Sequence, residues 1–474
     1  MFFKNVLSVW VFVVVSTVLG CSTRVQNPVE HPSYLASFSL DDSTTVEVLA
    51  SLKHGGVTIK NGEERVFLTH VSGGVYSVPV FGGALVGEWV GEGDEKFWVG
   101  EWVDSLRIEE YRVPLKITPI DSGGDVLGVE NFSAWDTDLG RLKMTQRCDS
   151  VFATFLTSTG DYRYLAGKVD QETLRFKIGT FDGVHLFSFE GTLRQDSITD
   201  GVFKSGTHYY TTWGGVRAVS DDVGWSSSQA WNPESEVVVR GVNSSGEVEV
   251  WTRERLRGSG YRVLVVDVMG TWCPNCMDEA RLLKTLTDDY PKMIVVSMAF
   301  ERSSGKEALK RIANFKADMG LPWDVLLGGR ANKGVADSAL SFIGGIKSFP
   351  TTVFIPIEGE PVVHSGFSGP ATGGSYEEEV RFFKTTIEAL LLWMIEYASK
   401  SSSDVSALLT QIFKSSILFS CFKTSIFVIP TALIANNAIK PIRISLVLLV
   451  ENTPMFSKNS ASFSSSCSSV FNSL

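Results

Sequence analysis

The sequence predicts two folded domains in series, an all-β sandwich or barrel followed by an α/β domain. Three observations lead to this fold class. The chain has 474 residues, which is more than one compact unit of either kind requires. Short runs of alternating apolar and polar residues, separated by Gly, Asp and Pro, fill residues 75–218. A longer apolar run, Val263–Val268, is followed by a helix-like stretch, Met277–Leu286.

Residues 1–20 have the features of a lipoprotein signal peptide. Lys4 gives a short positive region, and the apolar run Val6–Leu19 is shorter than the ~20 residues that span a bilayer. Val18-Leu19-Gly20-Cys21 is similar to a bacterial lipobox, so we expect cleavage before Cys21 and lipidation of that cysteine. Plain secretion with an incidental Cys21 is the alternative. Ser22 does not resemble a signal for inner-membrane retention, which leaves an outer-membrane location open.

The front part of the chain is predicted to be β structure. Residues 21–74 are expected to form a linker with irregular β segments, and residues 75–218 the all-β domain. Val86-Gly87-Glu88-Trp89-Val90 recurs as Val99-Gly100-Glu101-Trp102-Val103, which we interpret as two arms of one hairpin. His185 and His208 are interpreted as structural groups, Cys148 as a lone structural thiol, and no metal site is predicted.

The most informative motif is Trp272-Cys273-Pro274-Asn275-Cys276, between the apolar run and the helix-like stretch. Two cysteines two residues apart at a strand-to-helix junction indicate a dithiol/disulfide redox centre. Cys273 would lie where the helix begins, where free N–H groups and the helix dipole favour a thiolate. Pro274 suits the first helical position because its missing N–H needs no partner. Cys276, almost one turn later, can reach back to close a disulfide.

Two simpler interpretations of the cysteine pair are weaker. A zinc site needs a second pair of ligands, and Cys21, Cys148, Cys421 and Cys467 are single and distant in the sequence. A structural disulfide across so short a loop removes little chain entropy.

Residues 235–398 resemble the thioredoxin superfamily, specifically the TlpA/ResA-like thiol-disulfide oxidoreductases of the bacterial envelope. The resemblance rests on four ordered pieces. They are the strand Val263–Asp267, the turn and helix Gly270–Glu279, the strand Met293–Met298, and Phe349-Pro350-Thr351-Thr352-Val353-Phe354-Ile355, which is similar to the cis-proline loop and its following strand. The front region resembles the all-β domain of some Gram-negative TlpA-like lipoproteins.

This resemblance implies further elements and a substrate groove. The spacing between Cys273 and Pro350 leaves room for a TlpA-type insertion, a helix over Gly305–Met319 and a strand near Trp323–Leu327. A last strand over Glu360–Ser365 and a closing helix over Tyr376–Tyr397 are expected. A cis Phe349–Pro350 bond would face the cysteines and pair with an extended substrate segment. The groove residues implied are Trp272, Pro274, Phe349, Pro350 and Thr351.

Two acidic residues are candidates for managing the proton of Cys276. Asp267, six residues before Cys273, matches the buried carboxylate of thioredoxin, where many TlpA-like proteins have a neutral residue. Glu279, three residues after Cys276, matches the glutamate of ResA-like proteins. The alternatives are a strand-end cap for Asp267 and a solvated first-turn acid for Glu279.

The predicted function is therefore that of an envelope thiol-disulfide oxidoreductase, with reduction of substrate disulfides favoured and no cofactor beyond the Cys273–Cys276 disulfide. Expected partners are disulfide-containing envelope proteins, an upstream thiol donor, and the membrane through lipidated Cys21, with the protein facing the periplasm. The net charge of −10 argues against nucleic acid as a partner.

Two other functions are weighed against this one. A peroxiredoxin-like peroxidase would share the fold, but the threonine-before-cysteine pattern is missing. A metallochaperone or a non-catalytic binding lipoprotein is the third possibility, with His364 as the one remotely placed copper ligand. Residues 400–474 are serine-rich at both ends with interrupted apolar runs between, and we interpret them as an atypical, non-native extension that is disordered or weakly membrane-associated.

Overall fold

The computed structural model describes residues 22–23, 33–53, 55–104, 107, 111–120, 126–127, 130–220, 228–229 and 231–392. The predicted signal peptide, Cys21 and the tail 400–474 therefore lie outside the described residues, as do the last residues of the predicted closing helix. Within the described part of the chain, no helix combines the length and the apolar character needed to cross a membrane.

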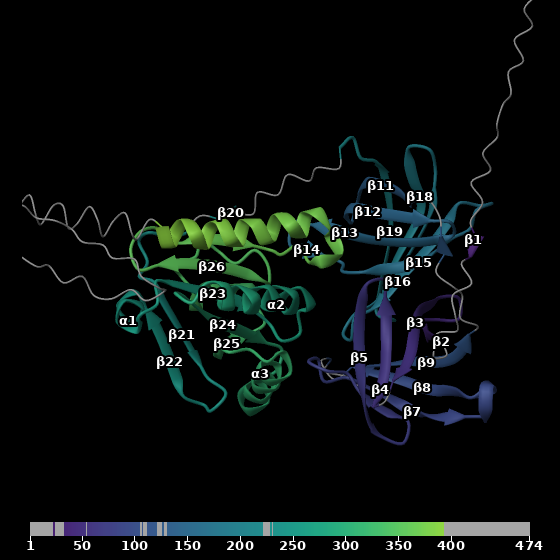
Figure 1. Cartoon of the computed structure of the whole chain (residues 1–474), viewed down its shortest axis with the longest axis horizontal. Helices are drawn as coiled ribbons and strands as arrows, with labels where there is room; N and C mark the ends of the chain where they lie inside the picture. Colours follow the sequence, from purple (N-terminus) through teal and green to yellow (C-terminus); the bar gives the residue numbers. More distant parts are fainter. Residues whose placement is uncertain are drawn as a thin grey trace, which may run out of the picture. The chain divides into compact units, whose positions relative to one another are not determined.

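The first β unit is a closed barrel in which each strand pairs with the next and β2 pairs with β9 (Figure 1). Its strands are β2 (Ser33–Ser39), β3 (Thr45–Lys53), β4 (Gly56–Asn61), β5 (Glu64–Ser72), β6 (Val75–Ser77), β7 (Ala84–Val90), β8 (Phe97–Asp104) and β9 (Tyr111–Ile120). Closure leaves no strand edge unpaired. Side chains alternate between the core and solvent, as along β3, where Val46, Val48 and Ala50 are buried.

A linker with irregular β segments is predicted over residues 21–74, whereas residues 33–74 supply four complete strands of this barrel. The sequence signal was weak because several of these strands face solvent on one side, and their short alternating runs read as irregular segments.

The repeated Val-Gly-Glu-Trp-Val segments form the predicted hairpin. They lie on β7 and β8, joined by the 3-10 turn η1 (Gly93–Glu95), with Gly87 opposite Gly100. A Cβ atom on Gly87 would lie 2.3 Å from the Val99 carbonyl oxygen and 2.6 Å from the Trp98 ring. The two glycines are therefore needed where Trp98 crosses the strand pair.

The second β unit is a nine-stranded antiparallel sheet in which β12 also pairs with β13, so that the sheet curls back on itself. Its strands are β11 (Glu130–Thr137), β12 (Gly140–Arg147), β13 (Ser150–Thr157), β14 (Gly160–Asp161), β15 (Leu165–Val169), β16 (Arg175–Phe181), β17 (Leu186–Leu193), β18 (Ser197–Ser205) and β19 (Tyr209–Arg217). Aromatic rings fill its interior, and Phe189 stacks on Phe203 at 4.4 Å between ring centroids. A separate pair, β1 (Ser22–Thr23) and β10 (Val126–Leu127), is antiparallel.

The second β unit has its own core and also contributes residues to the core of the barrel. Phe181, at the end of β16, is fully buried in the barrel, where it stacks on Phe38 and meets Trp102 edge to face. Asn61 of β4 fixes this position, because its side chain both donates to the Phe181 carbonyl and accepts from the Phe181 N–H. The all-β region is thus two sheets that pack on one another, not the single domain expected from residue 75.

The α/β domain is built on an eight-stranded mixed sheet in the order β20-β27-β26-β23-β24-β25-β21-β22 (Figure 1). Its strands are β20 (Ser228–Gln229), β21 (Val238–Val242), β22 (Val248–Thr252), β23 (Val263–Met269), β24 (Met293–Glu301), β25 (Val325–Arg330), β26 (Thr351–Pro356) and β27 (Val362–Ser365). Its helices are α1 (Arg253–Ser259), α2 (Pro274–Asp289), α3 (Gly305–Met319), α4 (Lys333–Ala339), η2 (Pro370–Thr372) and a closing helix over residues 374–392.

The centre of this sheet explains the continuous apolar run in the sequence. Every residue of β23 is buried, because β23 lies between β24 and β26 and both sheet faces carry an apolar core. β23, β24 and β25 are parallel, whereas β26 and β27 are antiparallel. This is the thioredoxin-like arrangement that the resemblance implies, and a helix occupies residues 305–319 as predicted.

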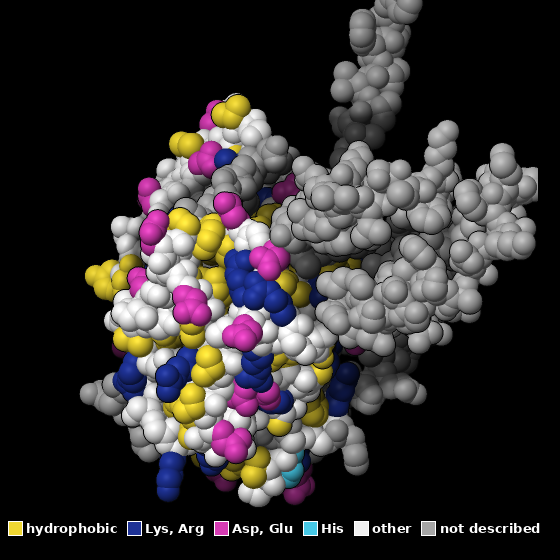
Figure 2. All heavy atoms as spheres, turned by 90° about the vertical axis from the view of Figure 1, so that its left-hand side faces the viewer, with side chains coloured by type: hydrophobic (Ala, Val, Ile, Leu, Met, Phe, Trp, Pro, Cys, Tyr) yellow, Lys and Arg dark blue, Asp and Glu magenta, His cyan; other side chains and the backbone are white. Residues whose placement is uncertain are grey.

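The surface is mixed in charge. Figure 2 shows acidic and basic side chains interspersed with small apolar groups over one face of the molecule. An extended field of one sign is not visible on that face.

Phe181 gives a test of the shared core. Replacing Phe181 by Ala should lower the free energy of opening of the barrel amides, measured by hydrogen exchange, by about 3–5 kcal/mol, because a buried ring is lost and a cavity remains. Phe132→Ala is the control, since Phe132 is 74% exposed and should change the value by less than about 0.5 kcal/mol. A loss below about 1 kcal/mol at Phe181 would show that the two units do not depend on one core.

Candidate active site

The two cysteines lie between the end of β23 and the first turn of α2, as predicted. They form a disulfide with an S–S distance of 2.23 Å and a Cα–Cα distance of 5.3 Å. Cys273 is the N-cap of α2, Pro274 is its first residue, and the Cys273 sulfur accepts the Cys276 N–H at 3.2 Å. Cys273 keeps 5% exposure and Cys276 none. After reduction, Cys273 would have a backbone donor and a helix N-terminus beside its sulfur, and both favour a thiolate.

The Phe349–Pro350 bond is cis, as predicted. The Cys273 sulfur lies 3.6 Å from the Phe349 carbonyl oxygen, so this loop faces the dithiol. Thr351 begins β26 and is fully buried, with its hydroxyl donating to the Ser348 carbonyl at 2.8 Å. Its side chain therefore helps to hold the loop, and none of it is exposed to a groove.

Trp272 is held beside the loop by contacts that no sequence pattern indicated. Its indole N–H donates to the Phe300 carbonyl at 2.9 Å, and the Arg302 guanidinium lies 4.6 Å from the centre of its ring. Phe349 meets the Trp272 ring edge to face at 5.8 Å. These partners follow Met298, where the sequence analysis ended the strand, whereas β24 continues to Glu301.

Asp267 is fully buried in the middle of β23. Its Oδ2 accepts from the Ser297 hydroxyl at 2.8 Å, and that hydroxyl oxygen accepts from the Trp323 indole at 2.9 Å. Its Oδ1 has no hydrogen-bond partner in the structure. Burial raises the pKa of Asp267 to about 7.

Glu279 is also fully buried, so it is not a solvated first-turn acid. It accepts a hydrogen bond from the Thr352 hydroxyl, and Thr352 lies opposite Asp267 in the pairing of β26 with β23. Burial, reinforced by the charge of Asp267, raises the pKa of Glu279 well above its usual value. The two candidates thus form one coupled pair, whose titration belongs to both residues.

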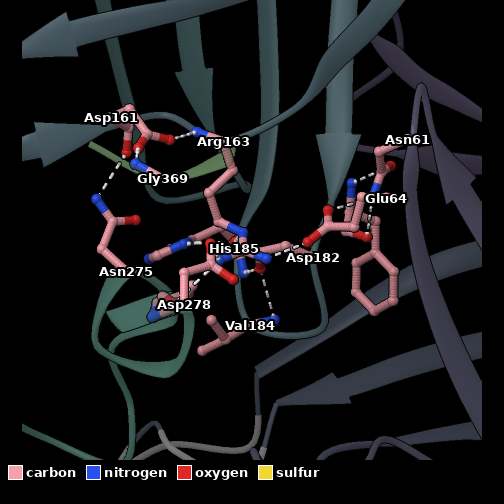
Figure 3. Close-up of polar contacts among 12 residues, drawn as sticks. Asn61, Glu64, Asp161, Arg163, Asp182, Val184, His185, Asn275, Asp278 and Gly369 are labelled. Carbon is pink, nitrogen blue, oxygen red and sulfur yellow. Dashed lines mark hydrogen bonds and ion pairs between the residues drawn. The ribbon is translucent and has the colours of Figure 1, made fainter. Parts of the chain in front are cut away.

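The second β unit contacts the redox motif itself, which no sequence pattern indicated. Arg163 follows β14, is 4% exposed, and donates to the Pro274 carbonyl at 2.9 Å and to the Asp278 carboxylate (Figure 3). Asn275, between the two cysteines, donates to the Asp161 carbonyl at 3.2 Å. Pro274 is consequently buried, so its predicted place in an open substrate groove does not hold for this arrangement.

Asp161 also holds the loop that follows β27. Its Oδ2 accepts the Gly369 N–H at 2.5 Å, and its Oδ1 accepts the Arg163 N–H at 2.6 Å. Burial raises the pKa of Asp161 to about 6, although the Gly369 hydrogen bond opposes the shift. The glycine-rich loop over 366–369 is therefore a docking surface for the second β unit as well as a turn.

The remaining candidates have structural partners. His364 Nε2 lies 2.8 Å from Glu379 Oε2, and the His364 ring packs on Phe382. His185 contacts Asp182, and His208 packs against Tyr111. Within the described residues, no group of three or more His, Cys, Asp and Glu side chains is placed to hold a metal ion. Cys148, expected as a lone thiol, is disulfide-bonded.

The solved structures compared here are each similar to about a third of this chain. The chain matches no protein-family model and no curated protein. A secreted disulfide oxidoreductase of Mycobacterium tuberculosis homologous to E. coli DsbE is 17% identical, with 29% of this chain and 91% of that chain covered and a TM-score of 0.22. A thioredoxin-family thiol:disulfide interchange protein of Chlorobium tepidum is 19% identical, with 32% of this chain and 97% of that chain covered and a TM-score of 0.22.

A third solved structure is the thioredoxin domain of a Bacteroides vulgatus thiol-disulfide oxidoreductase. It is 15% identical, with 33% of this chain and 99% of that chain covered and a TM-score of 0.22. At these scores the likeness carries no weight of its own, and the fold follows from the strand order and the motif geometry described above.

Asp267 gives a pH-dependent prediction. Its folded pKa of about 7 exceeds the ordinary value of 3.8, so the folded state binds more protons between these values and stability falls as pH rises from about 4 to about 7. The free energy of unfolding of the oxidised protein should therefore depend less on pH in Asp267→Asn, with a difference of at most roughly 4 kcal/mol across the window. Chemical denaturation at stepped pH measures this.

Asp288→Asn is the matched control, because Asp288 lies exposed on α2 and should leave the profile unchanged. Identical slopes for the wild type and Asp267→Asn would show that Asp267 is not held protonated by the fold.

Proposed function

We propose that this protein is a thiol-disulfide oxidoreductase that acts through Cys273 and Cys276. The observation that carries the proposal is the disulfide at the N-cap of α2, with the Cys273 sulfur 3.6 Å from the carbonyl before a cis proline. A structural disulfide across three residues would not need a helix N-terminus and a facing loop. The combination supports a nucleophilic sulfur with a place beside it for a substrate disulfide.

The reaction consists of two thiol-disulfide exchanges. The Cys273 thiolate attacks one sulfur of a substrate disulfide, forms a mixed disulfide and releases the other substrate sulfur as a thiolate. Cys276 then loses its proton and attacks Cys273, which breaks the mixed disulfide and releases the second substrate thiolate. The substrate gains two electrons, and the enzyme returns to the disulfide form. An upstream dithiol must reduce it again.

The division of roles follows from exposure. Cys273 retains some exposure and touches the loop, whereas Cys276 is fully buried and its proton must leave within the protein. Asp267 and Glu279 supply buried carboxyl groups with raised pKa values, and each has one oxygen without a hydrogen-bond partner. A carboxylate of this pair can accept the Cys276 proton as the mixed disulfide resolves.

The direction and location of the reaction rest on the sequence resemblance. We infer that the protein reduces disulfides of envelope proteins, faces the periplasm and is anchored through lipidated Cys21. Trp272 and Phe349, both half-buried beside the dithiol, support a groove for an extended polypeptide segment.

The roles of the cysteines are tested by trapping. With a disulfide-containing protein substrate, Cys276→Ser should accumulate at least about tenfold more mixed disulfide than Cys273→Ser, because the resolving thiolate is missing. Non-reducing electrophoresis and peptide mapping of the adduct to Cys273 measure this in the full chain. Equal trapping by both variants would contradict the assignment, and the double serine variant gives the background.

The direction is tested by the reduction potential of the Cys273–Cys276 couple. Equilibration with dithiothreitol and glutathione buffers, followed by alkylation, should give a value near the thioredoxin potential of about −270 mV. A value near about −120 mV would make the protein an oxidant and would contradict the reductive direction. A pair that does not reduce and reoxidise reversibly would overturn the proposed function itself.

A further inference from the structure

Arg163 is a buried cation that the second β unit brings to the redox motif. It follows β14 and precedes β15, with a backbone φ of 59° that its N–H bond to Asp161 stabilises. Left-handed backbone at a residue other than glycine is uncommon and costs free energy. In this backbone conformation, the Arg163 side chain points toward α2 (Figure 3).

The guanidinium joins three segments of the protein. One Nη group donates to the Pro274 carbonyl and the Asp278 carboxylate, both on α2. The other donates to Glu64 at the start of β5, and Nε lies 3.8 Å from the Asp182 carboxylate. These contacts are made by a side chain with only 4% exposure, so solvent and salt screen them little.

More than one carboxylate surrounds the single positive charge of Arg163. Three carboxylates face it, from Glu64, Asp182 and Asp278. Burial alone would lower the pKa of Arg163, but these acids raise it, so the guanidinium stays charged. His185 contacts Asp182, and Arg281 contacts Asp278 from the solvent side. Asp278 lies on the same helix as the cysteines, five residues after Cys273.

A charge at this place acts differently on the two redox states. Reduction of the disulfide adds two electrons and one proton, which gives a Cys273 thiolate and a Cys276 thiol. The thiolate carries a negative charge that the disulfide lacks. A nearby cation stabilises the thiolate, and an unpaired Asp278 carboxylate destabilises it. Arg163 contacts the carbonyl of the residue next to Cys273 and also neutralises Asp278.

We propose that Arg163 is a positioning residue of the second β unit that stabilises the reduced, thiolate form of Cys273 and so raises the reduction potential of the couple. This rests on the proposed function, because it concerns the same dithiol. The contact between the second β unit and α2 then sets the reduction potential of the Cys273–Cys276 couple. Loss of this contact would lower the potential and make the dithiol a stronger reductant.

The competing explanation is that Arg163 only holds the second β unit against α2, without an electrostatic effect on the dithiol. Two substitutions that remove opposite charges distinguish these explanations. Arg163→Met removes the cation and approximately keeps the volume. Asp278→Asn removes the opposing anion but keeps an oxygen that can accept from Arg163. If Arg163 acts only by holding the two parts together, both substitutions should shift the dithiol–disulfide equilibrium in the same direction. If it acts through its charge, the two substitutions should shift the equilibrium in opposite directions.

The experiment equilibrates the full-length protein with mixtures of reduced and oxidised glutathione and quantifies the dithiol by alkylation. Arg163→Met should shift the equilibrium toward the disulfide by about tenfold, which corresponds to about 30 mV for two electrons. Asp278→Asn should shift it toward the dithiol, and the double variant should lie near the wild type. The pH profile of Cys273 alkylation should move upward in Arg163→Met and downward in Asp278→Asn.

Arg175→Met is the matched control, because Arg175 pairs with Glu190 on neighbouring strands of the same sheet and should leave the equilibrium unchanged. If Arg163→Met does not fold, the sign of the shift in Asp278→Asn decides. No shift in either variant, or shifts in the same direction, would overturn the inference while a reversible wild-type couple kept the proposed function. An irreversible wild-type couple would overturn the function instead.

Discussion

The redox domain depends on keeping one sulfur ready to carry negative charge in a place that water hardly reaches. Cys273 is 5% exposed and Cys276 is fully buried, so bulk solvent supplies little stabilisation for a thiolate. The fold replaces it with the start of α2, where Cys273 is the N-cap and its sulfur accepts a backbone N–H. The pairing of β23 with β26 then places the cis-proline loop against that sulfur.

The proton of Cys276 must also move in a part of the protein that water hardly reaches. Asp267 and Glu279 come from different elements, a central strand and the redox helix, yet Thr352 links them because it bonds Glu279 and lies opposite Asp267. Burial raises the pKa of both carboxyl groups, and the charge of Asp267 raises the pKa of Glu279 further. The role proposed for this pair is to accept the proton of Cys276 when the mixed disulfide is resolved.

The all-β region is joined to this chemistry by polar contacts, not by sequence proximity. Arg163 and Asp161 lie more than a hundred residues before α2, yet they form hydrogen bonds with Pro274, with Asn275 and with Gly369 of the glycine-rich loop. This interface is rich in charge, and Arg163 of the second β unit forms ion pairs both with Glu64 of the barrel and with Asp278 of helix α2.

Local pattern alone determined the strand–CxxC–helix unit, the helix over 305–319 and the hairpin of the repeated segments, because apolar periodicity and turn chemistry are written in neighbouring residues. The sequence indicated only irregular β segments before residue 75, and not the barrel strands of residues 33–74, because their burial arises only once distant strands close the barrel. Likewise the pairing of Asp267 with Glu279 and the approach of Arg163 to Pro274 are products of the tertiary structure. A side chain's charge is visible in the sequence, but its burial and its partners depend on which segments pack together.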